Sequence, residues 1–193
     1  MRHLHRATWT ICLALGGIVT GTGTLFAQAQ TVERPVAKEK NPLGDIPDSQ
    51  VFIAYHSPLG FTLKVPEGWS RTDRTAGVRF SDKYGEIDVA VEARSEPISV
   101  ATVRTVDVKK LEQSGRAVVI GTVKSVQLPA GSAVLVTYAA NSAPNTVTGK
   151  QIRLEHERYL LAHGGKVVAL DFSAPAGADN ADQWRLMSRS FAW

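Results

Sequence analysis

Two histidines and a glutamate in the last third of the chain have side chains that bind metals, but their spacing does not suit a metal site. His156-Glu157 followed by His163 suggests a zinc peptidase, yet that site needs His-Glu-x-x-His within one helix. On a strand, positions 156 and 163 face opposite sides of a sheet. A solvated charge pattern along one strand face, Arg153, Glu155 and Glu157, explains these residues better. We therefore predict no metal ligands.

A hydrolase triad can be drawn from Ser57, His56 and Asp171. The sequence has no Gly-x-Ser-x-Gly motif to place a nucleophilic serine on a strand-to-helix turn. Ser57 comes directly before Pro58, so turn formation explains it more simply. We predict no catalytic residues and no enzyme activity; a small envelope hydrolase that uses His56 or His156 is the rival hypothesis.

The single cysteine, Cys12, lies within an apolar stretch near the N-terminus. The rest of the chain therefore contains no disulfide, thiolate zinc site or iron–sulfur ligand. We predict no cofactor. Trp69 and Trp184 are expected to pack in a core, with ligand stacking as the alternative.

The first 29 residues have the three-part pattern of a bacterial secretory signal. Arg2 and Arg6 are followed by an uncharged, centrally apolar stretch that ends in Ala27-Gln28-Ala29, which suits signal peptidase. Threonines and glycines in its second half favour cleavage over a retained membrane anchor, although residues 7–29 are long enough to span a bilayer. Both interpretations place the remaining chain outside the cytoplasm, in the periplasm or secreted.

Charge and composition divide the remainder into a linker and one domain. Removing residues 1–29 takes away two arginines and no acid, so 20 basic and 18 acidic residues leave a net charge of +2. The charges are interspersed, so no nucleic-acid partner is expected. Residues 30–50 contain three prolines and no apolar periodicity, which predicts a flexible linker. Residues 51–193 have the size of a single domain.

Alternating apolar residues predict antiparallel strands over most of that domain. Short strands are expected at 52–56 and 61–65, and a hairpin at 76–81 and 86–93. Four longer strands follow at 117–128, 132–139, 151–162 and 166–173. The connections are mostly tight turns, which join antiparallel neighbours.

Two helices complete the predicted fold. Ser99 is a good N-cap for a helix over 99–114, although the β-branched residues between 102 and 108 weaken it. A second helix begins at Asp179 or Asn180 and carries Trp184 on its apolar side. We expect an α+β domain in which an antiparallel sheet of about six to eight strands carries a mid-chain and a C-terminal helix.

Two segments of the domain resemble the PsbP family, which includes an extrinsic subunit of photosystem II, a nuclear Ran-binding relative and many exported bacterial proteins. The stretch Tyr55–Trp69 is similar to the family's opening strand, turn, "Gly-Phe-x-Leu-x-x-Pro" and "Gly-Trp", and Asp182–Phe191 is similar to its last helix. The resemblance implies an α/β/α sandwich and a non-enzymatic binding or assembly role. The residues that would define this fold are Phe61, Pro66, Gly68, Trp69, Trp184 and Phe191.

The functional hypothesis is an exported, non-enzymatic binding or accessory protein of the cell envelope with an unknown protein partner. Two loops are the expected contact surfaces, because loops on a rigid scaffold carry function. Their candidate contact residues are Asp82, Lys83, Tyr84, Asn141 and Asn145. A further alternative is a carrier that holds a small apolar ligand between a helix and the sheet. A membrane is expected as a partner only through residues 7–29.

Overall fold

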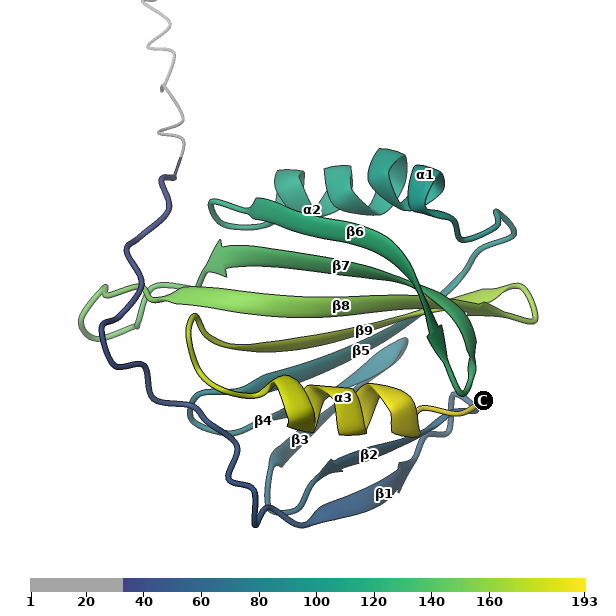
Figure 1. Ribbon diagram of the computed structural model, residues 1–193, viewed down its shortest axis with the longest axis horizontal. Helices are drawn as coiled ribbons and strands as arrows, with labels where there is room; N and C mark the ends of the chain where they lie inside the picture. Colours follow the sequence, from purple (N-terminus) through teal and green to yellow (C-terminus); the bar gives the residue numbers. More distant parts are fainter. Residues whose placement is uncertain (1–32) are drawn as a thin grey trace, which may run out of the picture. The chain divides into compact units, whose positions relative to one another are not determined.

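The computed structural model describes residues 33–193, so the predicted export segment at 1–29 lies outside the described residues. Within the described part of the chain, no helix has the length and apolarity needed to cross a membrane. The elements are β1 (Phe52–His56), β2 (Thr62–Pro66), β3 (Ser70–Arg74), β4 (Gly77–Ser81), β5 (Glu86–Ala93), α1 (Val100–Thr102), the π-helical turn η1 (Val103–Asp107), α2 (Val108–Ser114), β6 (Val119–Leu128), β7 (Gly131–Asn141), β8 (Arg153–His163), β9 (Lys166–Pro175) and α3 (Ala181–Ser190) (Figure 1).

The predicted α+β class is confirmed. Seven strands form one sheet in the order β3-β4-β5-β9-β8-β7-β6, and every neighbouring pair is antiparallel. The first two strands form a separate two-stranded sheet, and Thr62 of β2 also forms an antiparallel bridge with Ala192. One strand was not predicted: β3 has the sequence Ser-Arg-Thr-Asp-Arg, is exposed throughout and lies at the edge of the large sheet.

Helix α3 covers one face of the large sheet, in front of the strands in Figure 1. Trp184 and Met187 of this helix are buried against a core that includes Phe172 of β9, and the rings of Phe172 and Trp184 stack at 6.2 Å. Phe61 stacks on Phe191 at 5.6 Å, which ties the β1–β2 hairpin to the end of the helix. The C-terminal helix therefore packs on the sheet as predicted.

Two further residues of the PsbP-like stretch shape the chain after β2. Pro66 is buried at the end of the strand, and Gly68 adopts φ +85°, a conformation that favours glycine. Trp69 is half-buried and packs against the same core.

The mid-chain helix packs on the opposite face, beside β6 in Figure 1. The Ser99 hydroxyl accepts a hydrogen bond from the Thr102 N–H, and the Thr102 hydroxyl accepts one from the Ser99 N–H, which forms a capping box. The next turn, Val103–Asp107, is π-helical. This turn coincides with the β-branched residues that weakened the helix prediction, and those side chains lose rotamer freedom in a helix.

Residues 33–50, for which the composition predicted a flexible linker, lie extended along the domain and contact it at several points (Figure 1). Asn180 accepts a hydrogen bond from the Ile46 N–H at 2.7 Å and donates one to the Gly44 carbonyl at 2.9 Å. Ile46 is buried in the core on the α3 face. Specific side-chain partners on the domain thus hold a segment that has no regular secondary structure of its own.

Candidate functional site

The turn between β4 and β5 is a firmly built loop that presents two of the predicted contact residues. Asp82 accepts hydrogen bonds from the backbone N–H groups of Tyr84 and Gly85, which closes the turn. A Cβ at Gly85 would come within 2.7 Å of the Trp69 ring, so the turn backbone packs directly on that indole. Lys83 is exposed, and its ammonium lies 5.0 Å from the centre of the Tyr84 ring.

The second predicted loop is divided between a structural and an exposed part. Asn141 is the last residue of β7 and only 4% exposed, with its side chain hydrogen-bonded to Val36, Arg153 and Glu33. Its buried amide therefore organises the loop rather than projecting from it. Asn145 is exposed and accepts bonds from the N–H groups at 147 and 148, which forms a turn.

The residues around Asn141 also correct the expected charge pattern of β8. Arg153 is 6% exposed and donates to the carbonyls of Ala117 and Ala139 as well as to Asn141. Burial lowers the pKa of Arg153. A solvated face was expected here, but β8 lies inside the sheet and the end of β7 covers this guanidinium.

Both loops border one concave surface of about 570 Å³, which we call the polar hollow. Its walls are the β4–β5 turn, the end of α2 with Arg116, and residues 141–143. The polar hollow thus joins Lys83 and Tyr84 to Asn141, although these residues are far apart in the sequence. Asn145 lies outside its lining.

The floor of the polar hollow includes a line of hydrogen-bonding side chains across five neighbouring strands. Strand register places these residues side by side, and we call them the polar row: Ser81, Glu86, Ser173, His156 and Tyr138. Four of its five members were not singled out as site residues from the sequence. Only the pairing of β4, β5, β9, β8 and β7 brings them together.

A buried carboxylate beside the polar row fixes two of its members. Asp171 accepts hydrogen bonds from the Tyr138 hydroxyl at 2.7 Å, His156 Nδ1 at 2.9 Å and Arg158 Nη1 at 3.0 Å. Burial by itself would raise the pKa of Asp171, but the hydrogen bond and charge of His156, the Arg158 charge and the Tyr138 hydroxyl outweigh it and lower this pKa. Burial, followed by the Asp171 charge, raises the pKa of Tyr138.

The same contacts determine the protonation and the orientation of the His156 ring. An ionised Asp171 can only accept, so Nδ1 of His156 carries the proton in their hydrogen bond. The imidazole ring stacks on Tyr138 with centroids 4.2 Å apart and planes 11° apart. Its other nitrogen, Nε2, is buried and has no hydrogen-bond partner among the described residues. The ring is therefore held in place with one polar atom unused.

Glu86 has a different environment at the other end of the row. Burial raises the pKa of Glu86, whereas the Arg79 charge, with Nε 3.3 Å from Oε1, lowers it less. Asp88 and Asp171 add to the rise by repulsion. The pKa of Glu86, the carboxylate of the polar row, is thus raised, whereas the pKa of the buried Asp171 beside the row is lowered.

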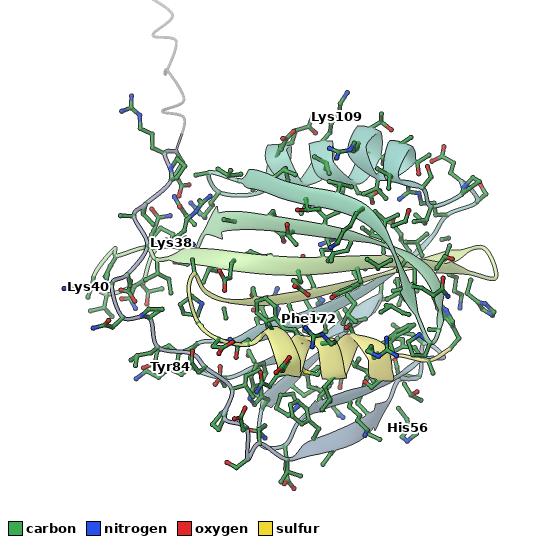
Figure 2. The ribbon with its side chains drawn as sticks, in the orientation of Figure 1. Lys38, Lys40, His56, Tyr84, Lys109 and Phe172 are labelled. Carbon is green, nitrogen blue, oxygen red and sulfur yellow. The ribbon has the colours of Figure 1, made fainter. Side chains whose placement is uncertain are left out.

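The structure separates the residues of the hydrolase triad drawn from the sequence. Ser57 Oγ accepts a hydrogen bond from the Leu59 N–H at 3.1 Å and so stabilises the turn. His56 belongs to the two-stranded sheet. Asp171 bonds His156 instead. Figure 2 shows His56 well apart from Tyr84, the turn residue at the polar hollow. Ser57 and His56 therefore form no triad with Asp171.

The two histidines of the metal motif are also apart. His163 lies seven residues further along β8, roughly 23 Å in an extended strand, and stacks on Trp193 with ring centroids 5.2 Å apart. Among residues 33–193, no three potential metal ligands come together.

Neither a protein-family model nor a curated protein matches the sequence. Several solved structures are similar in fold. Cyanobacterial PsbP (CyanoP) from Synechocystis sp. PCC 6803 gives a TM-score of 0.49 at 15% identity over 78% of this chain and 98% of that one. LpqN of Mycobacterium tuberculosis, involved in cell envelope biogenesis, gives 0.45 at 14% identity over 79% and 88%. A Pseudomonas aeruginosa protein of unknown function gives 0.44 at 12% identity over 69% and 91%. At these values membership of the PsbP family stays a prediction.

Proposed function

We propose that this protein is an exported, non-enzymatic binding module that docks a polar segment of a protein partner into the polar hollow. One observation carries the proposal: sequence-distant loops surround one hollow whose floor is a row of hydrogen-bonding side chains. A few polar groups placed in a hollow orient a ligand and give it specificity.

The charges around the polar hollow support a polar partner segment without a strong net charge. Lys83 and Arg116 contribute positive charge, whereas Asp82 and Glu86 contribute negative charge. Mixed charges favour correct orientation over strong attraction of either sign. Tyr84 is half-buried at the rim, and tyrosine is enriched in protein interfaces because it combines a large apolar ring with a hydroxyl.

Site-specific crosslinking in the native host would test this proposal. A photoreactive phenylalanine analogue in place of Tyr84 is expected to form an adduct with the partner. The same analogue in place of exposed Lys109 on α2, away from Tyr84 in Figure 2, is the matched control and is expected to form none. Adducts of equal yield from both positions, or none from position 84, would contradict docking at the polar hollow.

The proposed location in the envelope needs its own measurement. Cell fractionation is expected to place the protein outside the cytoplasm, and N-terminal sequencing of that material is expected to begin at Gln30. Detection of the chain in the cytoplasm alone would remove the export hypothesis.

One geometric feature favours hydrolysis as a second candidate function. Asp171 orients His156, and Ser173 lies opposite His156 on the neighbouring strand, so the residue types of a catalytic triad are adjacent. Against this, no hydrogen bond joins the Ser173 hydroxyl to His156 Nε2 in the structure. A Ser173→Ala variant distinguishes the two: activity on an ester panel that disappears with Ser173 would replace the binding hypothesis.

A further inference from the structure

A second hollow lies on the other face of the large sheet, between the start of α3 and strands β6, β7 and β8. We call it the α3 groove; it has a volume of about 420 Å³. Trp184 lines it and is fixed by stacking on Phe172, which Figure 2 shows beside α3. Val119 also lines it and is 51% exposed, an unusual exposure for a valine in a strand. The groove therefore offers apolar contact area.

The α3 groove stays open because β6 is irregular where it passes the groove. The register of β6 against β7 shifts between Ile120 and Val123, and Gly121 lies within this bulge. A Cβ at Gly121 would come within 2.7 Å of Thr137 Oγ1, which accepts the Thr122 N–H at 2.8 Å. Glycine at this position brings β6 close to β7 without adding a side chain beside the groove.

The charged residues that line the groove are acidic. Glu155, Glu157 and Asp179 contribute carboxylates, and no lysine or arginine lines it among the described residues. His156 also lines the groove, but its imidazole bonds Asp171 on the other face of the sheet. The groove thus combines an apolar wall with a one-sided negative charge.

Hydrogen bonds hold two of these carboxylates. Glu157 accepts the Tyr159 hydroxyl at 2.6 Å, and Glu155 accepts the Gly177 N–H at 3.2 Å. Both bonds use Oε2, which leaves the Oε1 atom of each side chain without a bond among the described residues. Two residues apart on β8, the glutamates face the same side of the sheet.

The N-terminus of α3 would on its own favour an anion, because backbone N–H groups point outward there. Asp182 lies in its first turn and Asp179 directly precedes it, so negative charge already occupies this end. Arg185 of α3 pairs with Asp182 at 3.0 Å rather than with Glu155 or Glu157. Glu155, Glu157 and Asp179 are therefore the groove carboxylates that have no ion pair among the described residues.

We propose that the α3 groove binds a small organic ammonium ion with an apolar body. The ammonium group bonds Glu155 and Glu157, and the apolar body packs on Val119 and Trp184. This site is independent of the polar hollow and does not rest on the proposed partner docking.

A charge series of one shape tests the proposal on the purified protein. The probes are 2-phenylethylammonium, the neutral 2-phenylethanol and the anionic 3-phenylpropanoate. Saturable shifts of the Trp184 indole N–H signal in NMR spectra are expected for the ammonium, about tenfold weaker binding for the alcohol and none for the carboxylate. Equal binding of all three, or no saturable shift with the ammonium, would overturn the proposal.

Matched variants locate the binding. Glu157→Gln keeps the acceptor for the Tyr159 hydroxyl but removes the charge, and is expected to weaken ammonium binding about tenfold. Glu96→Gln removes a carboxylate that is 69% exposed and lies outside the groove, and is expected to change nothing. If Glu157→Gln does not fold, Glu155→Gln takes its place. If the folded variant binds the ammonium ion as wild type does, the assignment of the site to the α3 groove is wrong. This outcome does not depend on whether a partner docks at the polar hollow.

Discussion

The two faces of the seven-stranded sheet are buried in different ways, and β9 shows the difference within one strand. Phe172 faces α3 and belongs to a mainly apolar core, where packing contacts do not depend on a particular charged or polar partner. Asp171, one residue earlier, faces the other side and is 7% exposed, yet it carries charge and accepts three hydrogen bonds. The burial of a charge on this face therefore depends on specific hydrogen-bond partners, and the same dependence is common at functional sites.

The coverage of the two faces explains where the polar residues gather. The helix formed by α1, η1 and α2 packs over an apolar cluster with Val136 and Leu160 near β6, β7 and β8. Towards β4 and β5 the same face carries ion pairs, including Arg79 with Asp88 at 3.0 Å. The polar hollow opens between these two parts, where the end of α2 gives way to the β4–β5 turn.

The apolar face gives the largest expected effect. Phe172→Ala removes a fully buried ring and leaves a cavity, so the free energy of unfolding should fall by about 3–5 kcal/mol. Chemical denaturation at several pH values measures it. Because no titratable group is involved, the loss should be the same at pH 4 and pH 7; a strongly pH-dependent loss would show that the two faces are coupled.

The matching change on the polar face is Asp171→Asn. It leaves Arg158 and His156 without their anionic partner, and we expect a loss of about 2–4 kcal/mol at neutral pH, reduced because Arg158 is partly exposed. The folded protein lowers the pKa of Asp171 from its ordinary value of 3.8. Its stabilisation is therefore present above that value and is lost as the pH falls through the folded-state pKa.

The pH dependence separates this variant from Phe172→Ala. The stabilities of wild type and Asp171→Asn should begin to converge as the pH falls below about 4, where the carboxylate of the unfolded chain takes up a proton, and should meet below the lower folded-state pKa. A difference that stays constant down to pH 2 would mean that packing, not charge, makes Asp171 important.

The contrast between the faces also explains how far the sequence predicts this molecule. Strand alternation and the Ser99 cap are local signals, and they predicted the helices and most strands to within a few residues. Strand β3 was missed because Ser70-Arg-Thr-Asp-Arg has no apolar residue; its pairing with β4 holds it in place. The composition of residues 33–50 predicted a flexible linker. Their contacts with the domain were missed because the polar side chains that hold them, such as Asn180, lie far away in the sequence.

The candidate site likewise has a part that local sequence patterns predict and a part that depends on distant strands. The β4–β5 turn and the loop after Asn141 stand out in the sequence because of their composition, and both border the polar hollow. The polar row does not stand out, because Glu86, His156 and Ser173 become neighbours only through the register of three strands. No local pattern specifies such a register, which depends on how β5, β9 and β8 pair over their whole length.

A smaller change tests how much Asp171 depends on each partner. Tyr138→Phe removes one hydrogen bond to the carboxylate while keeping the ring that stacks on His156. The free energy of unfolding should fall by about 1.5–3 kcal/mol, the range for hydrogen bonds to charged groups. The double variant with Asp171→Asn, measured by the same denaturation curves, should lose less than the sum of the two single losses; strict additivity would mean that the hydroxyl does not act through Asp171.

The smallest expected effect has the opposite sign and comes from Glu86, the carboxylate of the polar row. Burial raises the pKa of Glu86 above its ordinary value of 4.5. Its contribution to stability is therefore complete below pH 4.5 and decreases as the pH rises through the folded-state pKa, because a charged form is then buried. Glu86→Gln should thus be slightly more stable than wild type at pH 7 and equal to it in acid, as thermal unfolding would measure. A glutamine variant that is less stable at pH 7 would mean that the ion pair with Arg79 outweighs burial, and Glu86 would then, like Asp171, stabilise the fold through its charge.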